Sequence, residues 1–262
     1  MLLLQRAPAQ SPSPQEFTPP PQSPSAQAPA AAAPAAQAPE SQPSPARSPL
    51  GTVVLDAAHG GTDSGARGEG GIVEKDVVAS LAQSLRHELE RRGVRVVVTR
   101  TGDGAPSFDD RAAVANAFAG AIFLSLHVAS SGPAATAIAY SLAQPPDSDP
   151  GGGRGDQPAS PAAYLIPWED AQLRFVNDSK RLAELLQIQL GQKFKGSPEV
   201  PGRGAIRQLL LVAHPAVAVE ISSVAVGNRK QLENMAPGLA EAVMRALEAF
   251  RQPQEPVKSG TR

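Results

Sequence analysis

The sequence contains no cysteine, no strong excess of either charge and no long hydrophobic run. Without cysteine the chain has no disulfide bonds, no catalytic thiol and no cysteine-ligated zinc. The lack of cysteine does not indicate whether the protein works in a reducing or an oxidising compartment. The net charge of −1, with no basic block, argues against a nucleic-acid-binding surface. A membrane-spanning helix needs about 20 apolar residues, and no run in this sequence approaches that length.

Several motifs that would suggest a function are absent as well. There is no GxxxxGK[ST] phosphate-binding loop, no GxSxG nucleophile elbow and no HExxH helix, so the mechanisms built on them lose their usual support. No secretory signal peptide is visible, because MLLLQR has only three consecutive leucines where about 7–15 apolar residues are needed. Either the protein is not exported by that route or its true start lies upstream of Met1.

The first 50 residues differ in composition from the rest of the chain. They hold 13 of the 27 prolines and 12 alanines but only four charged residues. Such a segment buries too little apolar surface to offset the entropy lost on ordering it. We therefore expect a disordered Pro/Ala/Ser/Gln-rich linker at 1–50, a single folded domain at 51–252 and a polar tail at 253–262.

Within 51–252, short apolar runs alternate with amphipathic helical patterns. This alternation predicts an α/β fold with a mostly parallel sheet of about six strands flanked by helices. A Gly/Pro/Asp-rich loop at 144–161 has the length of a functional or disordered loop. Strands are expected at 52–58, 94–100, 121–127, 135–142, 208–213 and 216–222, and helices at 74–93, 106–120, 168–194 and 229–250. One apolar stripe is expected on the first helix, formed by Val77, Val78, Leu81, Leu85 and Leu89.

Residues suited to binding a metal stand where the predicted strands end. His59 follows the first strand and His127 closes the third, while Glu74 begins the first helix and Glu220 lies near the end of the last strand. Ligand sites in open α/β sheets form outside the carboxyl ends of the strands, so these side chains are expected to converge. Two histidines and one carboxylate make a three-ligand zinc site with an open fourth position. A further carboxylate can then accept a proton from water.

Each of these residues also has a purely structural interpretation. A histidine at a strand end is more often hydrogen-bonded within the fold, and a glutamate in a first helical turn commonly stabilises the helix dipole. Glu220 is harder to explain in that way, because it interrupts the apolar run AVAVEIS, where an unpaired carboxylate is costly to bury. A metal, a bound water or an ion pair is expected to satisfy it.

The other polar candidates are weaker. His87 lies on a charged helix face and is expected to be solvated, and His214 fits a turn. Asp56 either orients His59 or caps its own turn. The simplest interpretation of Asp63 is a turn residue. Two residues of the second helix are expected to hydrogen-bond neighbouring loops: Arg111 and Asn116.

Four ordered motifs resemble those of a known enzyme family. VVLDAAHGGTDSGARG, EKD, RAAVAN with IFLSLH, and PAVAVEIS are similar to zinc-dependent N-acetylmuramoyl-L-alanine amidases of the amidase 3 type, over most of residues 52–250. The resemblance implies a largely parallel sheet and a Zn²⁺ cofactor held by His59, Glu74 and His127, with Glu220 as the catalytic glutamate. The implied reaction is hydrolysis of the amide between N-acetylmuramic acid and L-alanine.

The resemblance further implies a peptidoglycan or muropeptide substrate and a location in the periplasm or cell envelope. It leaves open whether an activator protein is involved. Three departures from the family pattern concern substrate contacts more than metal binding. Ala58 replaces a usual glycine, VASS follows His127, and Asn228 comes late after Glu220. Two alternatives stand beside the amidase: a zinc peptidase acting on another amide, and a catalytically silent peptidoglycan-binding module on the same fold.

Overall fold

The computed structural model describes residues 51–143, 170–226 and 228–252. Four expected features lie wholly or partly outside these residues: the linker at 1–50, the loop at 144–161, the beginning of the 168–194 helix and the tail at 253–262. The domain boundaries therefore stay predictions. No helix in the described part of the chain combines the length and the hydrophobicity that a membrane crossing requires.

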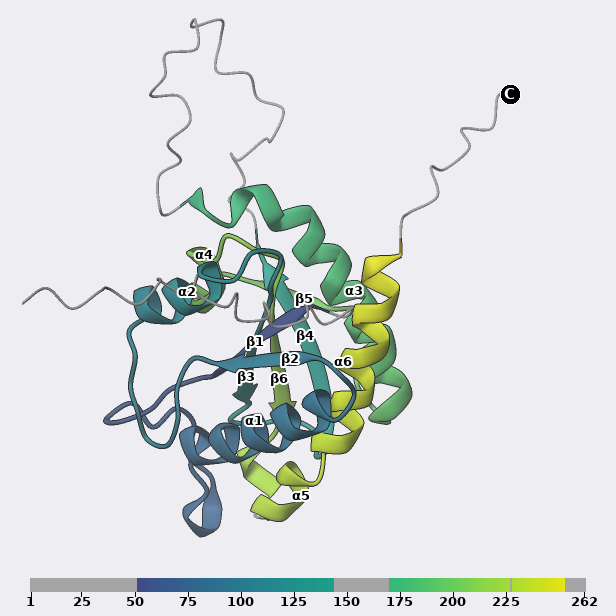
Figure 1. Cartoon of the computed structure of the whole chain (residues 1–262). Helices are drawn as coiled ribbons and strands as arrows, with labels where there is room; N and C mark the ends of the chain where they lie inside the picture. The colour runs from purple at the N-terminus through teal and green to yellow at the C-terminus, as the bar shows by residue number, and fades with distance from the viewer. Residues whose placement is uncertain (1–50, 144–169, 227, 253–262) are drawn as a thin grey trace, which may run out of the picture. The chain divides into compact units, whose positions relative to one another are not determined.

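One sheet of six strands forms the centre of the domain (Figure 1). The strands are β1 Thr52–Ala57, β2 Arg95–Val98, β3 Ile122–Val128, β4 Thr136–Leu142, β5 Gly202–Gly204 and β6 Ala216–Ser222. Their order across the sheet is β2-β1-β3-β6-β4-β5. Every neighbouring pair is parallel except β4 and β6, which run antiparallel. The expected mostly parallel sheet is thus confirmed.

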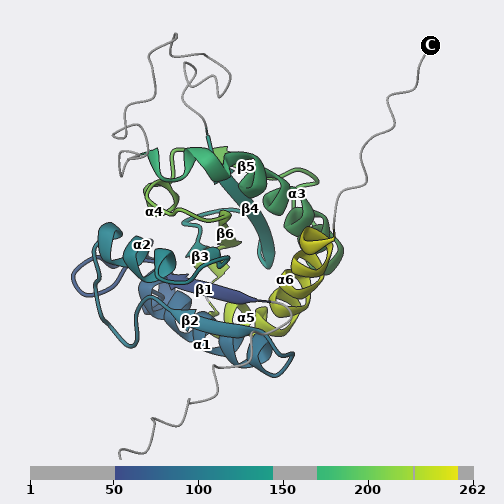
Figure 2. The same cartoon turned by 45° about the horizontal axis from the view of Figure 1, so that its top comes forward.

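Helices cover both faces of this sheet, as Figures 1 and 2 show. They are α1 Glu74–Glu90, α2 Phe108–Asn116, α3 Val176–Lys193, α4 Arg207–Leu210, α5 Arg229–Glu233 and α6 Ala236–Arg251. Helices α1, α3 and α6 pack on the face that carries Val53 and Leu55 of β1. Helices α2 and α4 pack on the opposite face, against Val54 and Phe123. The domain therefore has the three layers of an α/β fold.

Burial on two faces explains why the central strands are apolar runs. Val53, Val54 and Leu55 are all fully buried although they alternate between the two faces. The stripe predicted on α1 is confirmed, since its five members are 0% exposed: Val77, Val78, Leu81, Leu85 and Leu89. Their spacing places them on the one side of the helix that faces the sheet.

The prediction of a strand at 208–213 is wrong. Residues Arg207–Leu210 form the short helix α4, and the chain then turns toward β6. Leu209 and Val212 are fully buried whereas Leu210 is 37% exposed, so the buried positions are three apart, as in a helical turn. Periodicity does not separate a short apolar strand from a short buried helix. The sixth strand is instead β5, whose sequence Gly-Arg-Gly carries no apolar pattern.

The helix expected at 229–250 is divided into α5 and α6. The break falls at Asn234 and Met235, just before Pro237 in the first turn of α6. Proline fits a first turn because the missing amide hydrogen has no partner there, but inside a longer helix it would remove a hydrogen bond. Similarly, the helix expected at 168–194 begins as α3 only at Val176, after the short 3₁₀ turn Leu173–Phe175.

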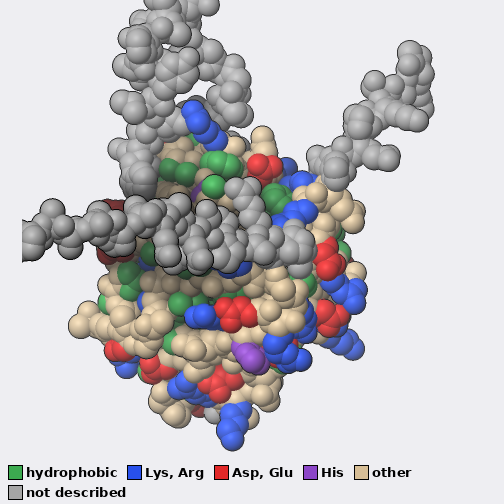
Figure 3. Space-filling view, in the orientation of Figure 1, with side chains coloured by type: hydrophobic (Ala, Val, Ile, Leu, Met, Phe, Trp, Pro, Cys, Tyr) green, Lys and Arg blue, Asp and Glu red, His purple; other side chains and the backbone are tan. Residues whose placement is uncertain are grey.

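Positive and negative side chains are interspersed on the face of the molecule seen in Figure 3. Many pair along a helix, as Arg86 does with Glu90 on α1 and Arg245 with Glu241 on α6. Exposed pairs of this kind add little stability, so the fold depends on its two apolar layers.

Candidate metal centre

The carboxyl ends of β1, β3 and β6 meet at one edge of the sheet, because these strands are parallel neighbours. His59 lies just beyond β1, His127 is near the end of β3, and Glu74 is the first residue of α1. The three side chains converge as expected, with their nearest ligand atoms all within 4.8 Å of one another.

Glu74 lies between the two histidines. Its Oε1 is 3.1 Å from Nε2 of His59 and 3.2 Å from Nδ1 of His127. The two imidazole rings meet edge to face, with centroids 5.5 Å apart. All three side chains are largely buried but reach the surface, with 6% of Glu74, 19% of His59 and 20% of His127 exposed.

Backbone amides hold the Glu74 carboxylate in place. The amide of Ala66 donates to Oε2 at 2.8 Å, and the amide of Val128 donates to Oε1 at 2.9 Å. Burial acts to raise the pKa of Glu74, but the contacts with His127 and His59 and these two amides outweigh it and hold the pKa well below its usual range. The carboxylate is therefore charged and fixed before any ligand arrives.

The outer nitrogen of each histidine has a partner of its own. Nδ1 of His59 is 2.8 Å from Oδ2 of Asp63, and Nε2 of His127 is 3.4 Å from Oγ of Ser125. The hydroxyl of Ser125 donates in turn to Asp56. Asp63 and Ser125 each offer an oxygen that can accept the hydrogen of the outer nitrogen, and in that tautomer the inner nitrogens would be free to bind an ion.

Two sequence interpretations change here. Asp63 is a turn residue, since its backbone pairs with Gly60, but it also orients His59. Asp56 does not touch the ring of His59, since its partners are Thr99, Ser125 and the guanidinium of Arg111. Only the spacing of histidine and aspartate four residues apart in the turn could have indicated the Asp63 contact.

The loop that carries His59 is held by a buried ion pair. Asp56 is 0% and Arg111 4% exposed, and the guanidinium that pairs with Asp56 also donates to the carbonyls of Ala57 at 2.9 Å and His59 at 2.8 Å. His59 itself has φ 62°, in the left-handed region that is rare for a residue with a side chain. Arg111 thus stabilises an unfavourable backbone conformation that aims the imidazole at Glu74.

Gly65 leaves no room for a side chain beside this cluster. A Cβ on Gly65, whose φ is +61°, would lie 2.5 Å from Oε2 of Glu74 and 2.7 Å from Cδ2 of His59. Only glycine lets the backbone pass so close to both side chains in this conformation.

The donor set fits a zinc ion. Ligands about 2.0–2.1 Å from a tetrahedral zinc are roughly 3.3 Å apart, close to the 3.1 and 3.2 Å that separate Glu74 from His59 and His127. Two imidazole nitrogens and a carboxylate also suit zinc in a site without thiolates. Three electron-rich atoms that face one space repel one another unless a cation or a proton lies between them.

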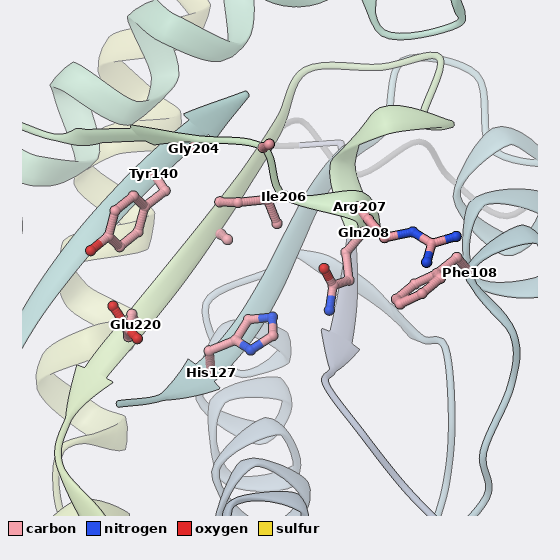
Figure 4. A pocket seen from close by; sticks show the side chains of 10 residues that line it. Phe108, His127, Tyr140, Gly204, Ile206, Arg207, Gln208 and Glu220 are labelled. Atoms are coloured by element: carbon pink, nitrogen blue, oxygen red, sulfur yellow. The ribbon is translucent and has the colours of Figure 1, made fainter. Parts of the chain in front are cut away.

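Glu220 stands beside this cluster but is not one of its members. It is half-buried and lies opposite His127 in the parallel register of β3 and β6. Both side chains line a cavity of about 400 Å³, shown in Figure 4. The hydroxyl of Tyr140 on β4 points toward Glu220 in Figure 4, and a hydrogen bond to Glu220 is among the causes that shift the pKa of Tyr140. Burial, with the charge of Glu220 and this hydrogen bond, raises the pKa of Tyr140.

The remaining polar candidates lie away from the cluster. His87 is exposed on α1 as expected, and His214 lies in the turn before β6, where burial lowers its pKa. Asn116 bonds the carbonyl of Leu211 and the amide of Ala213, which confirms its predicted contact with a neighbouring loop.

Comparison with known proteins then decides the family. The sequence pattern of the N-acetylmuramoyl-L-alanine amidases, amidase 3, matches residues 53–249. The chain belongs to this family. The match spans the domain from β1 to α6 and confirms the resemblance carried by the four motifs.

Individual relatives match over shorter stretches. N-acetylmuramoyl-L-alanine amidase AmiA of Salmonella typhimurium is 40% identical over 75 residues, which are 29% of this chain and 26% of AmiA. The alignment therefore spans only about a quarter of that curated relative.

Solved amidases share the fold over nearly their whole length. An N-acetylmuramoyl-L-alanine amidase from Clostridium difficile 630 has a TM-score of 0.55 at 20% identity, covering 76% of this chain and 95% of that one. The CwlD amidase of Clostridioides difficile, solved in complex with the GerS lipoprotein, has a TM-score of 0.53 at 21% identity, covering 76% and 97%. At these identities the similarity is one of fold.

Proposed function

We propose that this protein is a zinc-dependent hydrolase that cleaves the amide between N-acetylmuramic acid and L-alanine in peptidoglycan. The observation that carries the proposal is the convergence of His59, Glu74 and His127, whose ligand atoms lie within 4.8 Å of one another, in a chain of the amidase family. In this proposal the three residues hold the ion, and Glu220 takes part in catalysis from the neighbouring strand.

A bound zinc ion would polarise the scissile carbonyl and lower the pKa of a water molecule toward about 7. Glu220 accepts the proton of the attacking water and passes it to the leaving amine of L-alanine. Its place supports this role, because it opens into the same cavity as His127 without belonging to the ligand cluster. Tyr140 holds the carboxylate by donating its hydroxyl hydrogen.

Two alternatives are weighed against the amidase. A zinc peptidase acting on another amide would use the same residues, so only the products separate the two. A silent wall-binding module has no need for a charged, amide-held Glu74 between two oriented histidines. Buried polar groups arranged in this way are costly to maintain and favour an enzyme.

The substrate places the proposed activity in the periplasm or elsewhere in the cell envelope. CwlD, which shares the fold, was solved together with a lipoprotein. We include a protein partner in the proposal on that analogy.

Metal content and turnover together test the proposal. The purified chain, loaded with zinc and dialysed, should retain one zinc ion per chain by elemental analysis. It should hydrolyse an N-acetylmuramoyl peptide, lose this activity to a chelator and regain it with zinc. The His59→Ala variant should stay folded but bind substoichiometric zinc. Full zinc occupancy in that variant would remove His59 from the site, and turnover that survives complete metal removal would refute zinc dependence.

A further inference from the structure

The cavity beside the candidate metal centre has two chemically different ends. His127, Glu220 and Tyr140 line one end, and Phe108 and Arg207 lie at the other, as Figure 4 shows. Between them the wall is formed by small or apolar groups and one amide: Gly204, Ala205, Ile206, Gln208 and Ala218. Among the described residues that line this cavity, Arg207 is the only arginine or lysine.

Arg207 is held in position without an acidic partner. Its guanidinium carbon lies 4.9 Å from the centre of the Phe108 ring, a cation–π contact between α4 and α2. Among the residues that the structure describes, no carboxylate pairs with it, whereas Arg86 and Arg245 each pair with a glutamate on their own helix. Its planar face is thus occupied by the ring while its N–H donors remain available to a ligand.

We propose that Arg207, supported by Phe108, binds a free carboxylate of the stem peptide on the L-alanine side of the scissile amide. The inference rests on the proposed function and extends it to substrate selectivity. The sugar side of that amide is uncharged, because the lactyl carboxyl is consumed in the bond, whereas the peptide side carries the free carboxylates. Charge complementarity therefore orients the peptide toward Arg207 and away from Glu220.

A consequence is selectivity between two forms of the same peptide. The carboxylate on the residue after L-alanine is either free or amidated, and an amide offers Arg207 a neutral acceptor in place of an anionic one. Hydrogen bonds to charged groups are roughly twice as strong as neutral ones, so the free acid should be preferred by about tenfold. The two peptides should differ in KM rather than in kcat, because the carboxylate is bound equally in the ground state and the transition state.

Two synthetic N-acetylmuramoyl tripeptides that differ only in this group test the inference, with kcat and KM measured separately. The zinc-loaded wild type should favour the free acid by about tenfold in kcat/KM. Arg207→Gln should lose the preference through KM while kcat and the melting temperature stay unchanged, and Arg207→Lys should keep part of it. The matched control is Arg203→Gln, because Arg203 is exposed four residues earlier and lines a different cavity, with Ser141 and Glu199.

A wild type without preference, or an Arg207→Gln variant that keeps it, would overturn the inference. If the wild type hydrolyses neither peptide, the proposed function fails instead. A binding measurement then tests the inference separately. Calorimetry compares the free-acid and the amidated tripeptide, both without the sugar, on the zinc-loaded wild type and on Arg207→Gln. Equal affinities of the two peptides for the wild type would reject a carboxylate site at Arg207.

Discussion

His127 on β3 and Glu220 on β6 are direct partners in a parallel strand pair. Side chains at paired positions of neighbouring strands point from the same face of a sheet. The register of two buried strands therefore sets the distance between a candidate metal ligand and the candidate proton acceptor. A site built on strands in this way keeps its geometry better than one built on loops.

Replacing Glu220 by glutamine tests its role as proton acceptor. Glutamine is nearly isosteric but does not take up the proton, so kcat should fall by about 10²–10⁴-fold. KM, zinc content and melting temperature should change little, because proton transfer acts in the transition state. Loss of zinc would make Glu220 a ligand and Glu74 the better candidate for the base. Near-normal turnover with zinc retained would assign proton transfer to another group.

Tyr140→Phe removes only the hydroxyl that donates to Glu220. A hydrogen bond to a charged group contributes about 1.5–3 kcal/mol, so kcat should fall by roughly tenfold or more while zinc content stays the same. The same change in the Glu220→Gln background should cost much less, since the two residues act as a pair. Equal losses in both backgrounds would show that Tyr140 supports the fold rather than the carboxylate.

Gly65→Ala should weaken zinc binding because its Cβ would press against Glu74 and His59. The matched control is Gly102→Ala, since Gly102 has φ +58° against +61° for Gly65 but has no neighbouring atom within 4 Å. Both substitutions carry the same backbone penalty, about 1–2 kcal/mol, and should lower the melting temperature alike. Competition with a fluorescent zinc chelator should show a loss of affinity for Gly65→Ala alone. Equal zinc affinities of the two variants would show that a Cβ at position 65 does not disturb Glu74 and His59.

Asp56→Ala should destabilise the domain by about 3–5 kcal/mol, because it leaves the buried guanidinium of Arg111 without its partner. Urea unfolding measures this directly. The exposed pair of Arg86 and Glu90 serves as a control, since breaking it should have little effect. A loss for Asp56→Ala no larger than that of the control would show that Arg111 does not depend on Asp56.

Strong local patterns predicted most of the fold. The apolar runs that became β1, β3 and β6 and the apolar stripe of α1 are local patterns that packing reinforces. The convergence of His59, Glu74 and His127 followed from strand order, because parallel strands end at one edge. The ligand roles of these residues and the role of Glu220 remain predictions.

Features set by contacts distant in sequence could not be predicted in this way. The strand β5 has no apolar pattern and exists because β4 offers it an edge to pair with. Residues 207–212 pack as a helical turn because the buried layer accepts Leu209 and Val212 together. The contacts of Tyr140 with Glu220 and of Arg207 with Phe108 depend on the order of strands and helices around the cavity, which no local spacing encodes.

The products released from purified peptidoglycan test the central claim most directly. Zinc-loaded protein should release intact stem peptides with a free L-alanine amine and leave the glycan strands uncut, as mass spectrometry of the soluble fraction would show. The metal-stripped protein should release none until zinc is restored. Peptides cut at an internal amide would instead make the protein a peptidase. If the protein carried one zinc ion per chain and bound peptidoglycan but released no product, the proposed hydrolysis would be contradicted. The result would instead favour a wall-binding module.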